Sequence, residues 1–440
     1  MEAPQKKSTA EKSTEMSKRV RGMVKGMSQK AHQARAEGEP VAYSFVQGCY
    51  DEILAAMDVA TVGTENWAGL CAAKLDAERF ILKANAEGYP NHLCTYATCG
   101  LGYEAMRREL GGDAPPSAPD GGMASPTVML GTGMMICDPR YKWYQSARRY
   151  VDVPVNINGL LWPPVDADLD EVRERYIRYN LEELRDLVDF LERHLGRKMD
   201  WDRLAETVDL AERTVKVWYE AYQLRKAVPS PMPTEDALNT MVPGFFMLGT
   251  QETLDFYREL YDEIKYRLDN KIGVIPEEKY RLLWGAGLPP WFGLIIFNYF
   301  ESLGAVFPIE NAYPPPFPAE VPATVTDPLE RIVRRQFYSA TYYYDKARRN
   351  SGDHIVEWLL DMIREYKIDG VVCHRAITCR TIHVGQIHLL NVLKKYTDIP
   401  TLVLESDIVD VRAYSEADTH AKIDAFIEIV DAYKRKAISS

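Results

Sequence analysis

Short apolar runs alternate with amphipathic helical patterns in two parts of the chain. The first part holds three such runs, at 40–48, 125–135 and 151–158. The second part holds four, at 279–287, 303–311, 368–376 and 399–407. Strands that alternate with helices indicate parallel sheets whose faces are covered by those helices. The pattern therefore predicts an α/β fold.

The segment between these two parts has a different pattern. Apolar residues recur there at every third or fourth position, as on one face of a long helix, at Leu181, Leu184, Val188, Leu191 and Leu195. Gly196 follows them directly, which is typical of a helix end. We therefore predict four units: an N-terminal basic helical extension (1–40), a first α/β domain (41–165), a helical segment (166–275) and a second α/β domain (276–440).

The net charge of the chain limits which kinds of partner it can bind. The chain has 440 residues and a net charge of −11, whereas nucleic-acid binding needs clustered positive charge. A basic stretch at 6–38 lacks the apolar core of a signal peptide and is predicted to be a cytoplasmic tail with a helix that docks on a partner or lies in solvent. No apolar run is long enough to span a bilayer. We expect a cytoplasmic protein that binds neither nucleic acid nor a membrane.

Three of the seven cysteines carry a chemical signal. There is no C-x-x-C spacing, which excludes the commonest zinc and thioredoxin-type motifs. Cys137 and Cys379 each follow the predicted end of a strand, where α/β sheets bind ligands, and Cys94 precedes a helix. A helix N-terminus favours the thiolate form that binds metals. Cys94, Cys137 and Cys379 are therefore candidates to hold an Fe–S cluster or a metal ion.

Each cysteine can instead be a small buried hydrophobic residue. This interpretation is the better one for Cys49, for Cys71 on an apolar helix face and for Cys373 inside a strand. Cys99 fits either interpretation. The sequence alone therefore does not decide between a ligand and a core residue at any one position.

Histidines and carboxylates gather near the third candidate cysteine. The histidines at 374, 383 and 388 indicate proton transfer or ordinary packing. Glu405, Asp407 and Asp410 follow the last predicted strand. We expect these carboxylates to tie down a loop by pairing with Arg412 rather than to act in acid–base chemistry.

Several stretches together resemble the 2-hydroxyacyl-CoA dehydratase / benzoyl-CoA reductase family over nearly the whole chain. They are HLCTYATCGLG around Cys94, VMLGTGMMICDPRYKWY around Cys137, DGVVCHRAITCRTIHVGQ around Cys379, and the C-terminal IPTLVLESDIVDVRAYSEADTHAKIDAFIEIV. The segment GTENWAGL around Glu65 is similar to a short Glu-Asn motif of the family, although Gly63-Thr64 stands where the family has a proline.

The resemblance implies two flavodoxin-like or Rossmann-like parallel-sheet units and a [4Fe–4S] cluster held by Cys94, Cys137 and Cys379. It also implies two kinds of partner: a related smaller Fe–S subunit, and ATP-hydrolysing Fe–S activator subunits that supply single electrons. ATP would then be used by the activator and not by this chain. The length and the helical insertion are similar to those of the larger subunit.

Within the family, the N-terminal extension and the LCTY motif resemble the benzoyl-CoA reductase branch. That branch implies an oxidoreductase whose substrate is an aromatic acyl-CoA, with Glu65, His374 and His383 as candidates for proton transfer. The same stretches also fit a 2-hydroxyacyl-CoA dehydratase, a lyase that removes water through a ketyl radical. An electron-relay Fe–S subunit without its own substrate site and a structural zinc protein stay open as well.

Overall fold

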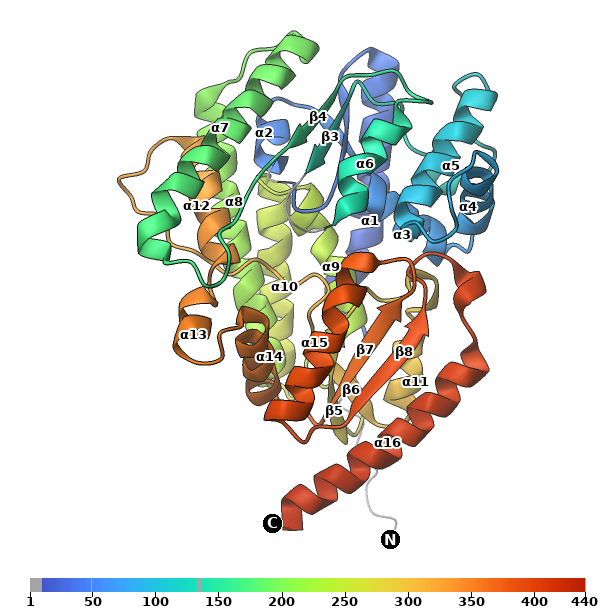
Figure 1. Ribbon diagram of the computed structural model, residues 1–440, viewed down its shortest axis with the longest axis vertical. Coiled ribbons are helices and arrows are strands. Elements are labelled where there is room, and N and C mark those ends of the chain that lie inside the picture. The colour runs from blue at the N-terminus through green and yellow to red at the C-terminus, as the bar shows by residue number, and fades with distance from the viewer. Residues whose placement is uncertain (1–9, 49, 133–136, 440) are drawn as a thin grey trace.

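The computed structural model describes residues 10–48, 50–132 and 137–439, and it contains two four-stranded parallel sheets (Figure 1). The first sheet has the strand order β2-β1-β3-β4, with β1 (Val41–Ser44), β2 (Ala60–Gly63), β3 (Val128–Thr132) and β4 (Val155–Asn158). The second has the order β6-β5-β7-β8, with β5 (Tyr280–Ala286), β6 (Ala305–Glu310), β7 (Gly370–Ala376) and β8 (Thr401–Ser406). These sheets confirm the predicted α/β fold with two parallel-sheet units.

The helices of the first unit differ in one place from the pattern of the sequence. They are α2 (Asp51–Ala56), α3 (Thr64–Ala73), α4 (Ala77–Ala86), α5 (Thr95–Glu109) and α6 (Asp138–Ala147). The apolar periodicity across 64–88 suggests one helix, but the chain turns at Leu75, whose φ is 57°. A left-handed residue cannot continue a right-handed helix, so the segment splits into α3 and α4.

The segment between the sheets is helical, as predicted. It contains α7 (Leu169–Leu195), α8 (Trp201–Gln223), α9 (Thr234–Phe246) and α10 (Gln251–Asp269). The leucine stripe of α7 is the buried face of that helix, and Gly196 ends it in the left-handed conformation with a φ of 65°. The boundaries of the four units stay a prediction.

The remaining helices lie between and after the strands of the second sheet, and they do not all pack on it. These are α11 (Ile296–Ser302), α12 (Pro328–Ala340), α13 (Tyr344–Arg349), α14 (His354–Glu365), α15 (Arg380–Tyr396) and α16 (Glu416–Ser439). The Asp418 N–H lies 3.4 Å from the Ser415 hydroxyl, as a capping residue at the start of α16 requires. Among the described residues, no helix is both long enough and apolar enough to cross a bilayer.

The basic N-terminal helix packs against the chain itself. This helix, α1 (Glu15–Glu37), begins at Thr14, whose N–H and hydroxyl donate to the Asp236 carboxylate of α9 at 2.6 and 2.9 Å. The N–H of Met16 donates to Glu263 of α10, and Met16 and Val20 are buried. The expectation of a partner-docking or solvated helix is therefore wrong for residues 14–20, because these contacts fix that part of the helix on α9 and α10.

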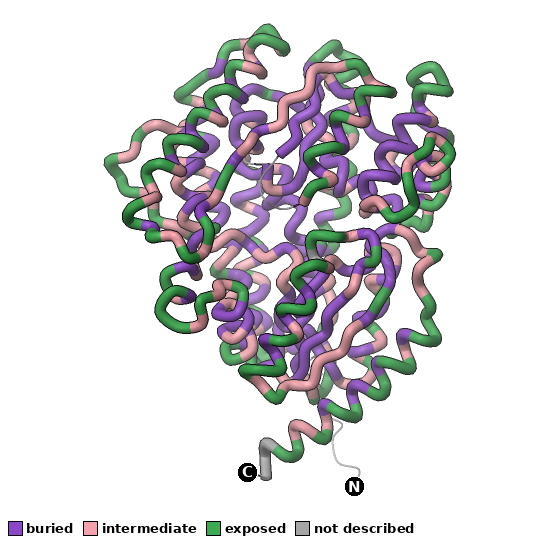
Figure 2. Tube along the Cα trace, in the orientation of Figure 1, coloured by how far each residue is buried: buried purple, intermediate pink, exposed green. Residues whose placement is uncertain are grey.

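The carboxyl ends of the two sheets meet in the middle of the molecule. In Figure 1, β7 and β8 point upward toward the unit that contains β3 and β4. One apolar cluster joins both units there, with Phe45 from beyond β1, Ala376 from the end of β7 and Ile408 from beyond β8. Figure 2 shows that the strands and this junction are largely buried. Residues that follow strands in either unit are thus brought into one region.

Candidate functional site

Cys94, Cys137 and Cys379 come together at the junction of the two units. Each lies at the N-cap of a helix, before α5, α6 and α15 respectively, and each is half-buried. The thiol of Cys94 interacts electrostatically with those of Cys137 and Cys379, and Cys137 interacts with Cys379. The three cysteines therefore share one site, although up to 285 residues separate them along the chain (94 to 379).

Asp407 joins the loops of two of these cysteines. Its buried carboxylate accepts hydrogen bonds from the hydroxyls of Thr95 at 2.6 Å and of Thr378 at 2.5 Å. Thr95 follows Cys94 directly, and Thr378 precedes Cys379 directly. The same carboxylate accepts the backbone N–H groups of Val409 and Asp410 at 2.9 and 3.0 Å. Asp407 thus fixes the α5 start of the first unit to the α15 start of the second.

An ion pair joins the loop of Cys137 to the loop of Cys379. Arg380, the residue after Cys379, forms an ion pair with Asp138, the residue after Cys137. Both side chains are largely exposed, so this pair contributes less to stability than the buried hydrogen bonds of Asp407. Together the two bridges connect the starts of α5, α6 and α15.

Two opposing influences act on the cysteine thiols: burial disfavours the thiolate, and nearby N–H groups and positive charge favour it. Burial is the largest influence on the Cys94 thiol and raises its pKa, whereas the backbone N–H of Ala97 acts in the opposite direction. Burial also raises the pKa of Cys137, against the charge of Arg140. Metal binding displaces thiol protons, and three helix N-termini directed at one site stabilise the thiolates that result.

The three cysteines are a donor set that an Fe–S cluster can use. Within the described ranges, no three cysteine, histidine or carboxylate side chains are arranged to hold one ion. Each cysteine of a [4Fe–4S] cluster binds a different iron, so its ligand sulfurs lie farther apart than the ligands of one zinc ion. Thiolates from three separate loops are a suitable donor set for such a cluster.

Glu65 forms a buried ion pair beside the cysteines. Its carboxylate receives Arg140 Nε at 2.9 Å and Nη2 at 2.5 Å, and the N–H of Val46 at 3.2 Å. Arg140 lies three residues after Cys137, and its guanidinium stacks 5.5 Å from the Phe45 ring. Its Nη1 is buried and has no acceptor among the described residues. The pair therefore places a cation with an unused N–H near Cys137.

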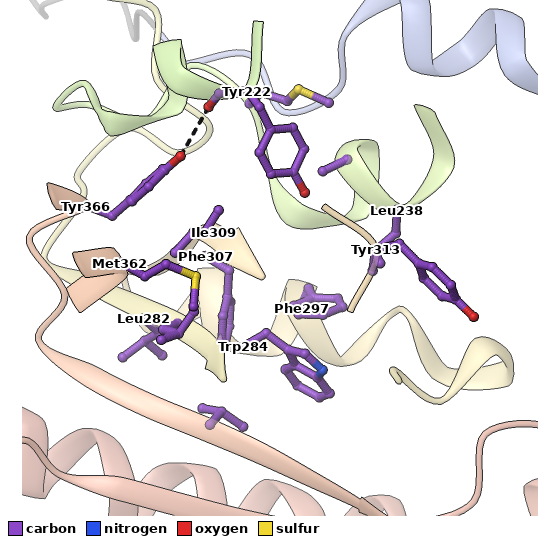
Figure 3. Close-up of a cluster of buried hydrophobic side chains, with 14 of the residues drawn as sticks. Tyr222, Leu238, Leu282, Trp284, Phe297, Phe307, Ile309, Tyr313, Met362 and Tyr366 are labelled. Atoms are coloured by element: carbon purple, nitrogen blue, oxygen red, sulfur yellow. Dashed lines mark hydrogen bonds between the residues drawn. The ribbon is translucent and has the colours of Figure 1, made fainter. Parts of the chain in front are cut away.

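A cavity of about 320 Å³ reaches this ion pair from the surface. Three buried residues, Glu65, Tyr96 and Tyr313, line its inner part. Tyr313 interacts electrostatically with Cys379 and Glu65 with Cys137, so this part of the cavity is near those cysteines, although none of the three lines it. In Figure 3, the Tyr313 hydroxyl points away from the other labelled core side chains. The volume is typical of a site for a small organic ligand.

The cavity walls come from both units and from α1. Trp291 donates its indole N–H to the Tyr96 hydroxyl, and its ring lies 6.3 Å from that of Tyr313. The other apolar wall residues are Val20, Val24, Val46, Leu70, Leu238, Met241, Val242, Phe246 and Leu294. Composition gave no sign of this cavity, because its walls are assembled from distant segments.

The predicted proton-transfer histidines lie elsewhere. His374 is buried in β7, with Nδ1 2.6 Å from the Leu288 carbonyl and Nε2 2.7 Å from the Ser406 hydroxyl. Burial lowers its pKa to about 4, so its ring is neutral at pH 7. Burial also lowers the pKa of His383 in α15. Neither residue lines the cavity, whereas Glu65 does.

The remaining sequence predictions for this region have separate outcomes. Cys71, Cys99 and Cys373 are fully buried, which confirms the packing interpretation for Cys71 and Cys373 and decides it for Cys99. Cys49 lies outside the described residues. Arg412 pairs with Asp410, as expected for one carboxylate, but Asp407 bonds the two threonines instead. The sequence therefore predicted a structural role for this acidic turn, but it did not indicate that Asp407 binds the two threonines.

The family model for the 2-hydroxyglutaryl-CoA dehydratase D-component matches residues 49–430. Among curated proteins, the chain is 24% identical over 407 residues to the alpha subunit of (R)-phenyllactyl-CoA dehydratase from Clostridium sporogenes, covering 92% of this chain and 93% of that protein. It is 24% identical over 418 residues to the alpha subunit of lactoyl-CoA dehydratase from Anaerotignum propionicum, covering 92% and 94%. It is also 24% identical over 424 residues to a benzoyl-CoA reductase subunit from Thauera aromatica, covering 93% of each. The chain belongs to the 2-hydroxyglutaryl-CoA dehydratase D-component family, which includes dehydratase and reductase subunits.

Proposed function

We propose that the chain is the Fe–S subunit of a benzoyl-CoA reductase-type enzyme, with a [4Fe–4S] cluster held by Cys94, Cys137 and Cys379. When bound, the cluster would supply single electrons at low potential. The observation that carries the proposal is the cavity that ends at Glu65, Tyr96 and Tyr313, near Cys137 and Cys379. A substrate-sized space near the ligands favours a substrate-binding subunit over an electron relay.

The cavity walls suit an aromatic acyl group. Apolar side chains surround most of the space, and the aromatic rings of Trp291, Tyr96 and Phe246 can pack against a flat substrate ring. Such walls exclude water from the reacting atoms, which strengthens electrostatic interactions inside. The role of this chain would be to bind the thioester, hold its ring near the cysteines and keep water out.

Polar groups at the inner end can serve the thioester and the proton. The hydroxyls of Tyr96 and Tyr313 line the same end, and Glu65 is held in place by Arg140 and Val46. Glu65 is therefore the strongest of the three proton-transfer candidates, and a tyrosine hydroxyl is a second candidate donor.

A 2-hydroxyacyl-CoA dehydratase subunit is the second candidate function. Dehydratase alpha subunits match as much of this chain, at the same identity, as the reductase subunit. In that case the same cavity would hold a 2-hydroxyacyl thioester, and the inner polar groups would assist loss of water. In both cases we propose a related smaller subunit and an ATP-hydrolysing activator as partners.

One titration tests the proposal. The chain, purified under anaerobic conditions with its partner subunit, is titrated with benzoyl-CoA and separately with a 2-hydroxyacyl-CoA, while the electron paramagnetic resonance signal of the reduced protein is followed. A signal change with benzoyl-CoA alone supports the reductase. A change with the hydroxyacyl-CoA alone supports the dehydratase. No change with any thioester contradicts a substrate-binding role and favours a relay.

A further inference from the structure

We propose that Arg21 of α1 binds the nucleotide phosphates of the acyl-CoA at the mouth of the cavity. This inference rests on the proposed function, because it assumes that the cavity takes an acyl-CoA thioester. It gives α1, which the sequence analysis described only as a basic helix, the role of binding the phosphate-bearing end of the substrate.

The cavity has an inner end and an outer end. Along α3, its lining residues are Glu65, Asn66, Gly69, Leu70 and Ala73, which share one helix face. The rise of an α-helix places Ala73 about 12 Å from Glu65 along the axis. Glu65 is buried, and Ala73 is exposed. The cavity therefore runs from near the cysteines outward along α3.

Arg21 lies at the outer end and is free to bind an anion. It is exposed, and it lines the cavity together with Ser17, Val20 and Val24 from the same face of α1. Among the described lining residues it is the one cation, and no ion pair or side-chain hydrogen bond involves it within the described ranges. The neighbouring cations Lys18 and Arg19, by contrast, pair with Glu15 and Glu259.

The other charged lining residues already have partners. Glu65 pairs with Arg140, and Asp120 pairs with Lys74 at 3.1 Å. The outer end therefore combines one unpaired guanidinium, within the part of the chain that the structure describes, with the neutral amide of Asn239. A guanidinium binds phosphate oxygens through two parallel N–H groups, so the geometry suits a phosphate better than an apolar group.

The position of α1 makes this anchor a rigid one. The start of the helix is held by Thr14 on Asp236, and Met16 and Val20 are buried beneath it. A cation on a fixed helix loses less conformational freedom on binding than one on a loose tail. An acyl-CoA would then place its thioester at the inner end while its phosphates remain at the helix.

Equilibrium binding to two thioesters tests the inference. The purified complex is titrated with benzoyl-CoA and with S-benzoyl-N-acetylcysteamine, which has the same thioester but no nucleotide. Arg21→Gln should weaken benzoyl-CoA binding about 10- to 100-fold and leave binding of the truncated thioester unchanged. Arg21→Lys should recover part of the loss. Lys18→Gln removes the same charge from α1 away from the cavity lining and should change neither affinity.

Three outcomes overturn the inference. Arg21→Gln can bind benzoyl-CoA as the wild type does, it can lose both thioesters equally, or Lys18→Gln can show the same loss. A wild-type complex that binds neither thioester, nor a 2-hydroxyacyl-CoA, refutes the proposed function itself. Unfolding midpoints of the two Arg21 variants should equal that of the wild type, because Arg21 has no partner to lose within the described residues.

Discussion

The Thr95 hydroxyl donates a 2.6 Å hydrogen bond to Asp407, a residue 312 positions away in the chain. This contact joins the loop of Cys94 to the second α/β unit, where the same carboxylate also holds Thr378 beside Cys379. The cysteine site is therefore a product of how the two units dock, and Asp407 is at the centre of that docking.

Replacing Asp407 tests this role. Asp407→Ala removes the acceptor of two buried hydroxyls and two backbone N–H groups, and the hydroxyls, 3.3 Å apart, can then bond only to each other. Such a loss is expected to lower the free energy of unfolding by about 2–4 kcal/mol. It should also reduce the iron bound after anaerobic reconstitution, because the loops of Cys94 and Cys379 are no longer held together.

Asp410 provides the matched control in the same turn. Its carboxylate pairs with Arg412 near the surface, so Asp410→Ala should cost about 1 kcal/mol or less and keep the iron content. Urea unfolding measures the first effect and iron analysis the second. Equal losses for the two variants would speak against a special role of Asp407.

Because Glu65 and Arg140 form a buried ion pair, we expect the stability losses of mutations at these two residues to be non-additive. Glu65→Gln leaves a buried guanidinium without its counter-charge, which is expected to cost about 3–5 kcal/mol of stability. The double variant Glu65→Gln/Arg140→Met should regain most of that stability, because both charges are gone. Urea unfolding of the two single variants and the double variant gives the coupling energy. Additive losses would mean that the two side chains do not interact.

Activity separates a chemical role of Glu65 from a structural one. If Glu65 moves a proton, the stable double variant should remain inactive toward its acyl-CoA while binding it normally. A double variant with wild-type turnover would remove Glu65 from the proton-transfer candidates.

The buried His374 ring should make the free energy of unfolding depend on pH. Its folded-state pKa is about 4, below the usual 6.5, because burial disfavours the imidazolium. The unfolded chain therefore binds more protons than the folded chain between these values. The stability that the neutral His374 ring contributes is fully present above pH 6.5. Up to about 3 kcal/mol of it is lost as the pH falls toward 4.

The variant His374→Gln removes this titration and keeps a polar side chain. Its unfolding free energy should fall less steeply than that of the wild type between pH 6.5 and 4. His92→Gln, at an exposed position, controls for the loss of a histidine and should keep the wild-type profile. Parallel profiles for wild type and His374→Gln would contradict a neutral buried ring.

Parts of this arrangement could be predicted from the sequence because they depend on local patterns. The alternation of apolar runs indicated both sheets but missed β2, whose four residues run directly into the helix α3 at Thr64. The positions of Cys94, Cys137 and Cys379 at helix starts follow from the same local pattern. Their convergence is a consequence of parallel topology.

Other parts depend on contacts between distant segments. Nothing near Asp407 indicates that it bonds threonines of both units, and nothing near Glu65 indicates Arg140, which lies 75 positions away. The cavity wall formed by α1 also could not be predicted, because a basic amphipathic helix fits a solvated tail as well as a docked one. Long-range pairing of polar groups is set by the fold and carries no local signature.

The central claim is that Cys94, Cys137 and Cys379 hold a [4Fe–4S] cluster, and iron and sulfide analysis of anaerobically purified protein tests it most directly. The wild-type chain should contain about four irons and four sulfides, and Cys→Ser at 94, 137 or 379 should remove most of both. Cys373→Ser, at a buried β7 position, should keep them. Full iron content in Cys137→Ser, or zinc in place of iron in the wild type, would contradict the claim.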